Sequence, residues 1–375
     1  MGAGSPVSVP GAVSVQGAAA QRTHLPVLGR EPARIEHSIT DRLAGRSERI
    51  HVLTGAVCNN NCVFCMEEDR DGRYEVNSAT TDETIRFLLE RHKDVEEMCF
   101  TSGEPTTNKR LPAWVRMAKD AGVRRISVMT NGRALSHEPY TRLLIAAGMR
   151  RFYVSIHGHT QKLHDGLVRT PGAFEQTVLG MQVVKKYAPH GVDLHTSTVI
   201  TKRNLPEIAR IYRFLVGLGV DQIVLNVMQA NGRADTNFEH IFPKYTEIAR
   251  AFGAFLEEER ARDARVGSRV VLVDIPLCTT ESIPDANRGY VEAYAHYEPP
   301  KNESHDQLLA ADEDPARRVA GPTGDLVKIT RGDLDDAARS KRAECKTCKH
   351  DASCEGVWTN YLSRFGWDEM VPVPR

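Results

Sequence analysis

The chain has 375 residues, enough for one large domain or for a large domain with a small one. Hydrophobic residues make up 41% and charged residues 26%, and 49 Lys and Arg balance 49 Asp and Glu, so the formal net charge is zero. This balance disfavours a general polyanion-binding protein, and we expect no nucleic-acid partner. No run of 18 or more apolar residues predicts a membrane span, so no membrane partner is expected.

The first segment, residues 1–45, is predicted to be a disordered N-terminal extension. Its first 21 residues are rich in Ala, Gly, Val, Ser and Pro, and they lack the basic start and dense apolar stretch of a signal peptide. Cysteines in a chain without a secretion signal are more often metal ligands than disulfides. We therefore expect a cytoplasmic protein.

Residues 46–267 alternate short β-rich runs with helical patterns. The strand runs are rich in Val, Ile, Phe, Thr or Met, and they are residues 50–53, 97–101, 125–130, 151–155, 193–199 and 222–227. The helical patterns are residues 81–92, 111–121, 138–147, 173–187, 205–218 and 245–259. Six successive β/α units predict an α/β fold with a parallel sheet, a partial (β/α)6 barrel whose ligand lies at the carboxyl ends of the strands.

The pattern changes after residue 267. Residues 270–277 predict one more strand, which ends just before Cys278, and residues from about 284 to 343 are polar and turn-rich, as in a long insertion. The last thirty residues contain three cysteines and two tryptophans. Residues 268–375 are therefore predicted to form a small cysteine-rich, cluster-binding subdomain that carries the polar insertion.

A cysteine motif follows directly after the first predicted strand. Cys58, Cys62 and Cys65 have the spacing C-x3-C-x2-C. Three thiolates on one loop can hold three corners of a [4Fe–4S] cluster and leave one iron open to a small molecule, which is a catalytic feature. A structural zinc site prefers four protein ligands. On spacing alone, a zinc knuckle or a pair of redox thiols remains the alternative.

This motif, with the aromatic Phe64 just before the third cysteine, resembles the signature of the radical S-adenosylmethionine (radical SAM) superfamily. The resemblance implies that the open iron binds the amino and carboxylate groups of SAM. It also implies that an electron from the reduced cluster cleaves SAM to a 5′-deoxyadenosyl radical, which abstracts hydrogen from a substrate. Phe64 is placed among the cofactor-binding residues on the same ground.

Three further motifs follow in the order that the family has. The second strand is followed by a motif similar to the family's G-G-E-P, with Ser instead of the first Gly: Ser102, Gly103, Glu104 and Pro105. The resemblance implies that backbone groups of this motif meet the amino group of SAM. Thr130 and Asn131 end the third strand in a T-N-G sequence, which is either a cofactor contact or an ordinary turn.

The last of these motifs ends the fourth strand. Ser155, His157, His164 and Arg169 fit the pattern S-[IL]-[DH]-G…H-D…R of family members with extra C-terminal clusters. The resemblance implies that Ser155 and Arg169 contact the ribose or carboxylate of SAM, and the guanidinium fork suits a carboxylate. For the two histidines, a structural hydrogen-bonding role is the alternative to a cofactor role.

Four cysteines form the second predicted metal site: Cys278, Cys345, Cys348 and Cys354. Four thiolates can ligate a second [4Fe–4S] cluster or a tetrahedral zinc ion. The C-x2-C-x5-C spacing and the aromatic tail resemble the C-terminal SPASM and twitch extensions of the family. A full SPASM domain has seven such cysteines, so four imply one auxiliary cluster, for electron transfer or for structural stapling.

These features together predict a radical SAM oxidoreductase or maturase. We expect it to act on a peptide or a small natural product and to receive electrons from a donor such as flavodoxin or ferredoxin. The alternatives are a noncatalytic, zinc-stapled α/β binding protein and a radical SAM methyltransferase, which needs a second SAM site or a cobalamin domain. No catalytic acid or base can be identified from the sequence.

Overall fold

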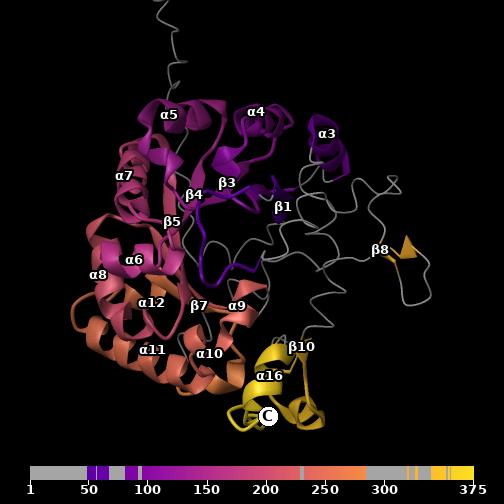
Figure 1. Ribbon diagram of the computed structural model, residues 1–375, viewed down its shortest axis with the longest axis vertical. Helices are drawn as coiled ribbons and strands as arrows, with labels where there is room; N and C mark the ends of the chain where they lie inside the picture. Colours follow the sequence, from indigo (N-terminus) through magenta and orange to yellow (C-terminus); the bar gives the residue numbers. More distant parts are fainter. Residues whose placement is uncertain are drawn as a thin grey trace, which may run out of the picture.

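A computed structural model describes residues 49–55, 57–66, 81–91, 95–228, 232–283, 319–320, 326–327, 339–351, 354 and 356–375 (Figure 1). The predicted N-terminal extension lies outside these residues, as does most of the predicted polar insertion. Within that insertion, β8 (Val319–Ala320) and β9 (Leu326–Val327) form a short antiparallel pair.

The core of the fold is a parallel sheet of seven strands in sequence order. The strands are β1 (Arg49–Leu53), β2 (Glu97–Thr101), β3 (Arg125–Thr130), β4 (Arg151–Ser155), β5 (Asp193–Ile200), β6 (Gln222–Val227) and β7 (Val270–Val273). The predicted parallel β/α architecture is confirmed. The sheet has one strand more than the six predicted for the barrel, because β7 pairs with β6 although it follows residue 267. The strand β7 is also shorter than the predicted strand 270–277, because Asp274 turns the chain with a φ of 62°.

Helices connect the strands and lie around the outside of the curved sheet (Figure 1). The predicted helical patterns correspond to α3 (Asp82–Arg91), α4 (Leu111–Asp120), α5 (Glu138–Ala147), α7 (Ala173–Lys185), α8 (Ile208–Gly217) and α11 (Tyr245–Arg260). Four short helices were not predicted: α9 (Arg233–Thr236), α10 (Phe238–Ile241), α12 (Val266–Arg269) and α16 (Thr359–Phe365).

The helix α6 (Gln161–Val168), which lies within the fourth motif, was also not predicted. The Thr160 hydroxyl accepts a hydrogen bond from the backbone N–H of Leu163, which is a regular helix N-cap. Leu163 and Leu167 then face the core at helical spacing. The helix ends at Arg169, whose φ of 51° is left-handed. The cap and the spacing were readable from the sequence.

A buried charge network fills the amino-terminal half of the inner face of the sheet. Glu97, with no exposed surface, lies 3.2 Å from a guanidinium nitrogen of Arg125, 3.5 Å from Arg49 and 3.9 Å from Arg151. The hydroxyl of Tyr153 also donates to Glu97, at 3.3 Å. Since β2 and β4 are separated by β3, these side chains meet across the concave face. The network therefore closes this end of the barrel.

The same inner face is open at the carboxyl ends of the strands. Cross-strand pairing puts five inner positions there, all half-buried: Thr101, Met129, Ser155, Ser197 and Asn226. The outward neighbours of these positions are buried under the helices. These partly exposed positions lie at the carboxyl end of the sheet, where a ligand of a parallel sheet is predicted to bind.

The C-terminal unit, residues 339–375 as far as they are described, packs against α10 and α11 (Figure 1). In this unit β10 (Arg339–Ser340) pairs with β11 (Val357–Trp358). The ring of Tyr361, on α16, stacks on Tyr245 at a centroid distance of 3.9 Å, and its hydroxyl accepts a hydrogen bond from the backbone N–H of Tyr245. The unit therefore shares the core of the barrel.

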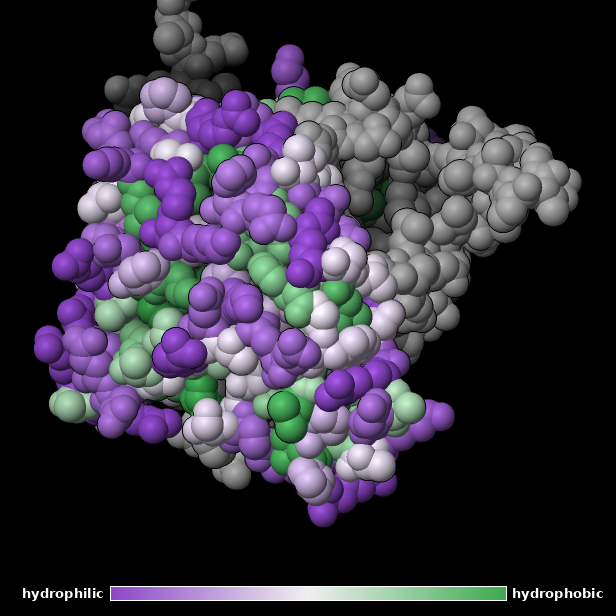
Figure 2. Space-filling model, turned by 60° about the horizontal axis from the view of Figure 1, so that its bottom comes forward, coloured by the Kyte–Doolittle hydropathy of each residue, from purple (hydrophilic) through white to green (hydrophobic). Residues whose placement is uncertain are grey.

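The described surface is mainly polar. Figure 2 shows hydrophilic residues over most of the described part of one face, with hydrophobic residues in small separate patches. No helix among the described residues has the length and apolar character needed to cross a bilayer.

Replacing Glu97 by Ala should destabilise the fold by about 3–5 kcal/mol, because the buried arginines would lose their compensating charge. Urea unfolding followed by circular dichroism measures this change. Glu83→Ala is the matched control, since its ion pair with Arg86 is exposed and its loss should leave the midpoint unchanged. A Glu97→Ala variant as stable as the wild type would show that the network does not stabilise the barrel.

Candidate active site

The cysteine loop, residues 57–66, lies at the carboxyl end of β1 and is fixed by backbone hydrogen bonds to two neighbours. The carbonyl of Val57 accepts from the N–H of Glu104 at 2.8 Å. On the other side, Asn61 donates to the carbonyl of Val168 at 3.0 Å, and Val63 donates to Leu167 at 2.9 Å. The loop therefore sits between the second motif and the end of α6.

The three thiols of the loop are half-buried and influence one another. Burial and then the charges of Cys58 and Cys65 raise the pKa of Cys62 to about 12, and the Arg233 guanidinium opposes this rise. The backbone N–H of Asn60 donates to the sulfur of Cys58 at 3.4 Å. Such a donor set, with a nearby cation and a backbone N–H aimed at sulfur, suits a cluster that carries negative charge.

The left-handed turn of the second motif is held by a buried carboxylate. Ser102 and Gly103 have φ values of 72° and 54°. Glu104, almost fully buried, accepts hydrogen bonds from Thr130 Oγ1 at 2.5 Å and from the backbone N–H of Asn131 at 2.6 Å. Burial raises the pKa of Glu104, and these donors oppose the rise. The carboxylate thus joins the second motif to the third.

The third motif also contacts the cysteine loop. The side-chain amide of Asn131 donates to Asn59 Oδ1 at 2.6 Å. Arg133, two residues after Asn131, donates to Asn60 Oδ1 at 3.0 Å and to the carbonyl of Asn59. Pro105 begins a short 3-10 helix and packs in the interior beside Thr106. The first three predicted motifs are therefore one hydrogen-bonded assembly.

The predicted SAM contacts of the fourth motif come from a strand and from a helix. Ser155 lies half-buried on the open inner face, opposite Ser197 of β5. Arg169 is exposed and follows Val168, which binds the cysteine loop. It lines a shallow surface pocket with Lys162. Both residues lie on elements next to the loop, and their roles toward SAM remain predictions.

Phe64 and the two histidines of the fourth motif pack together below the loop. Phe64 is buried, and its ring meets His157 edge to face at 4.7 Å. Nδ1 of His157 accepts from the backbone N–H of Val199 at 3.2 Å, and Nδ1 of His164 accepts from that of His157 at 3.1 Å. Both imidazoles are therefore neutral and satisfy backbone donors, which favours the structural alternative for them. Phe64 as a cofactor contact remains a prediction.

The second set of predicted ligands is brought together beyond the end of β7. One cavity is lined by all four of them: Cys278, Cys345, Cys348 and Cys354. Burial and then the charges of the other three thiols raise the pKa of Cys278 to about 12. The backbone N–H of Val373 donates to the sulfur of Cys348 at 3.4 Å. A shared cavity with four thiols fits a fully ligated cluster.

Neither thiol set has the arrangement of a preformed mononuclear site. Within the described residues, no group of three or more His, Cys, Asp or Glu side chains could hold a metal ion as it stands.

Two functional candidates escaped prediction. Arg133 and Arg233 both donate to carbonyl groups of the cysteine loop, from the carboxyl ends of β3 and β6. Their positions after predicted strands were a signal, because the ligand site of a parallel sheet lies there. Their partners could not be inferred, since the Arg233 contact joins residues 172 positions apart.

Comparison with known proteins agrees with this geometry. Residues 52–215 match the model of the radical SAM superfamily. AdoMet-dependent heme synthase of Methanosarcina barkeri is 32% identical over 206 residues, which are 55% of this chain and 57% of that protein. A probable GTP 3′,8-cyclase of Metallosphaera sedula is 29% identical over 200 residues, 53% of this chain and 61% of that protein. The chain thus spans about three fifths of these relatives.

Solved structures share the fold over a longer part of the chain. SuiB of Streptococcus suis, bound to precursor peptide SuiA, has a TM-score of 0.56 at 16% identity and covers 84% of this chain and 72% of its own. anSMEcpe with bound AdoMet and the Cp18Cys peptide has a TM-score of 0.50 at 14% identity and covers 86% and 95%.

The buried histidines predict a loss of stability in acid. Burial lowers the pKa of His164 from 6.5 to about 4 and lowers that of His157 well below 6.5, so between these values the unfolded chain binds protons that the folded state does not bind. The free energy of unfolding should therefore fall as the pH drops from 6.5 to 4, by at most about 1.4 kcal/mol per pH unit for each histidine.

Urea unfolding at pH 7, 6 and 5 measures this slope. In a His164→Asn variant, whose Oδ1 can still accept the bond from His157, the slope should be smaller than in the wild type. An unchanged slope would mean that His164 is protonated in the folded state.

Proposed function

We propose, starting from the match of residues 52–215 to the radical SAM superfamily, that this protein binds SAM at a [4Fe–4S] cluster held by Cys58, Cys62 and Cys65. We further propose that it uses SAM to modify a peptide or small natural product oxidatively. The observation that carries the proposal is the hydrogen-bonded assembly of the cysteine loop with the second and third motifs. This assembly lies at the open carboxyl end of the sheet.

When bound, the cluster supplies one electron that cleaves SAM and yields a 5′-deoxyadenosyl radical. The protein's own residues provide placement and shielding. The packing of Phe64 on His157 closes the space beneath the cysteine loop, and the charge network around Glu97 closes the far end of the barrel.

Three elements are proposed to hold SAM. The backbone of Ser102 and Gly103 would meet its amino group, Ser155 would contact the ribose, and Arg169 would pair with the carboxylate. The guanidinium fork of Arg169 matches a carboxylate in charge and shape. The exposure of Arg169 supports this role, since the side chain stands at the surface end of α6, next to the loop.

A peptide is the first candidate among the substrates. Ser197 and Asn226, on the open inner face, offer uncharged hydrogen-bonding groups that suit a polar but neutral substrate. Two proteins of similar fold, SuiB and anSMEcpe, have been solved with peptides bound. Both fold similarities extend through most of this chain.

An auxiliary [4Fe–4S] cluster is proposed at Cys278, Cys345, Cys348 and Cys354. Transfer of a hydrogen atom to the 5′-deoxyadenosyl radical would leave a substrate radical. That radical would complete a two-electron oxidation by losing a proton to solvent and one electron to the auxiliary site. A one-electron donor of the flavodoxin or ferredoxin type, in the cytoplasm, would supply the electron that cleaves SAM.

Metal analysis of anaerobically reconstituted protein tests both sites. We expect about eight irons and eight sulfides per chain, and about four of each when Cys345, Cys348 and Cys354 are all replaced by Ala. Cys99→Ala is the matched control, because this buried thiol of β2 belongs to neither set. Four irons with one zinc would reassign the C-terminal site as structural, and a protein without iron would overturn the proposal.

Replacing Arg169 by Ala should weaken SAM binding by about 10- to 100-fold, because the carboxylate would lose a charged hydrogen-bond partner. Equilibrium binding of SAM to the cluster-loaded protein and the yield of 5′-deoxyadenosine after dithionite reduction measure the effect. Arg142→Ala, at an exposed position of α5, is the charge-matched control. Equal SAM affinity in the two variants would show that Arg169 does not contact SAM.

A further inference from the structure

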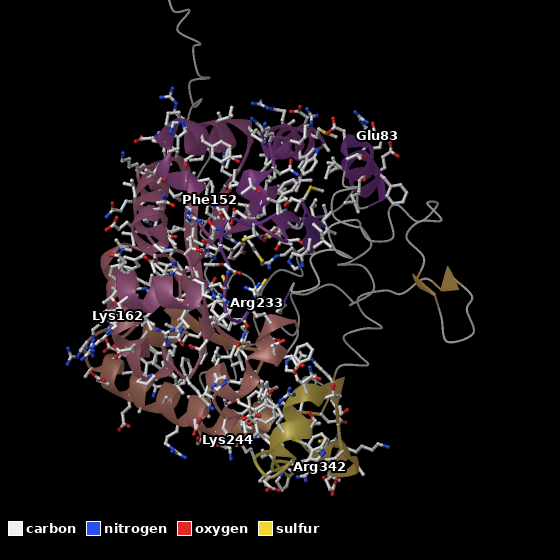
Figure 3. The ribbon with its side chains drawn as sticks, viewed as in Figure 1. Glu83, Phe152, Lys162, Arg233, Lys244 and Arg342 are labelled. Atoms are coloured by element: carbon white, nitrogen blue, oxygen red, sulfur yellow. The ribbon has the colours of Figure 1, made fainter. Side chains whose placement is uncertain are left out.

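Arg233 makes the most concentrated set of contacts to the cysteine loop. It is the first residue of α9, and Figure 3 shows it between the strands and the C-terminal unit. Its guanidinium Nη1 donates to the carbonyl of Asn61 at 3.0 Å, to Asn61 Oδ1 at 2.6 Å and to the carbonyl of Cys62 at 2.9 Å. Its backbone N–H donates to the carbonyl of Cys65 at 2.9 Å. One residue thus holds both ends of the C-x2-C segment.

These contacts satisfy carbonyl groups that an iron–sulfur cluster would repel. A thiolate-ligated cluster is anionic, so the carbonyl oxygens of a loop that surrounds it need donors on the side away from the cluster. Arg233 supplies these donors together with a positive charge.

The position of Arg233 is itself fixed from two directions. Asn237, at the carboxyl end of α9, donates to the carbonyl of Val63 at 3.1 Å and so ties α9 to the loop a second time. Asp235 pairs with Arg364 of α16 at 2.8 Å, which ties α9 to the C-terminal unit. The C-terminal unit therefore supports the first cysteine loop through α9.

We propose that Arg233 is a positioning residue that clamps the cysteine loop in its cluster-binding shape and, through its charge, raises the reduction potential of the cluster. The inference rests on the proposed function, because it requires a cluster on Cys58, Cys62 and Cys65. A nearby cation favours the more negative, reduced state of a cluster. A residue with a purely structural role would affect cluster retention but not the potential.

Two variants separate the clamp from the charge. Arg233→Gln removes the charge and the guanidinium fork, and Arg233→Lys keeps the charge but cannot make the same set of bonds. Arg210→Gln is the control, since it removes an equal charge from an exposed ion pair on α8. Each protein is reconstituted as full chain with the C-terminal cysteines replaced by Ala, so that only the first site contributes.

Two readouts are taken on these proteins without SAM. In a chelator challenge, the affinity of the protein for its iron should be about 10- to 100-fold lower in Arg233→Gln than in the wild type. Loss of other residues that hydrogen-bond to metal ligands has an effect of this size. The midpoint potential from a redox titration monitored by electron paramagnetic resonance should be more negative in Arg233→Gln. In Arg233→Lys the potential should stay near that of the wild type while iron retention falls. Arg210→Gln should match the wild type in both.

The possible outcomes distinguish failure of the role of Arg233 from failure of the proposed function. If the wild type takes up iron and both Arg233 variants match it in retention and potential, the role of Arg233 is overturned and the proposed function stands. If the wild type takes up no iron, the proposed function fails and the inference fails with it. Should Arg233→Gln not fold, Arg233→Lys decides, because retention equal to that of the wild type would exclude a clamp.

Discussion

The candidate site depends on the burial of one carboxylate, that of Glu104. The carboxylate accepts hydrogen bonds from Thr130 and Asn131, and the backbone N–H of Glu104 donates to the carbonyl of Val57. These bonds join the loops that follow β1, β2 and β3. A buried carboxylate without donors would be strongly unfavourable, so the three loops must keep their relative positions for Glu104 to remain satisfied. The geometry of the site is thereby built into the stability of the fold.

The inner face of the sheet changes character along the strands. At the amino-terminal end, Glu97 and its arginines fill the barrel with compensated charge, whereas at the carboxyl end the inner positions are small or uncharged and half-buried. Because side chains of one face recur at every second position, a few residues of sequence separate Glu97 from Thr101 on the same strand. Within one strand, the sequence therefore specifies both the buried charge network at the amino end and the partly exposed positions at the carboxyl end.

Local signals were enough to predict the parallel sheet and the order of its motifs, because strand runs, helical periods and cysteine spacing are short-range features. Other features depend on distant contacts. The pairing of β7 with β6 and the contacts of Arg233 join segments far apart in the chain, and no local pattern specifies them. The helix α6 was missed for a different reason: its residues were assigned to a motif, although Thr160 and the leucine spacing predict a helix.

In the proposed function, a cluster on the cysteine loop binds SAM directly. Pulsed electron paramagnetic resonance of the reduced protein tests this binding. It measures the coupling of the cluster's unpaired electron to the amino nitrogen of SAM, with SAM labelled with 15N at that position and with unlabelled SAM. Direct coordination predicts a changed spectrum on SAM addition and a coupling that switches from 14N to 15N with the label. A spectrum that SAM leaves unchanged, from protein with a full first cluster, would contradict the claim.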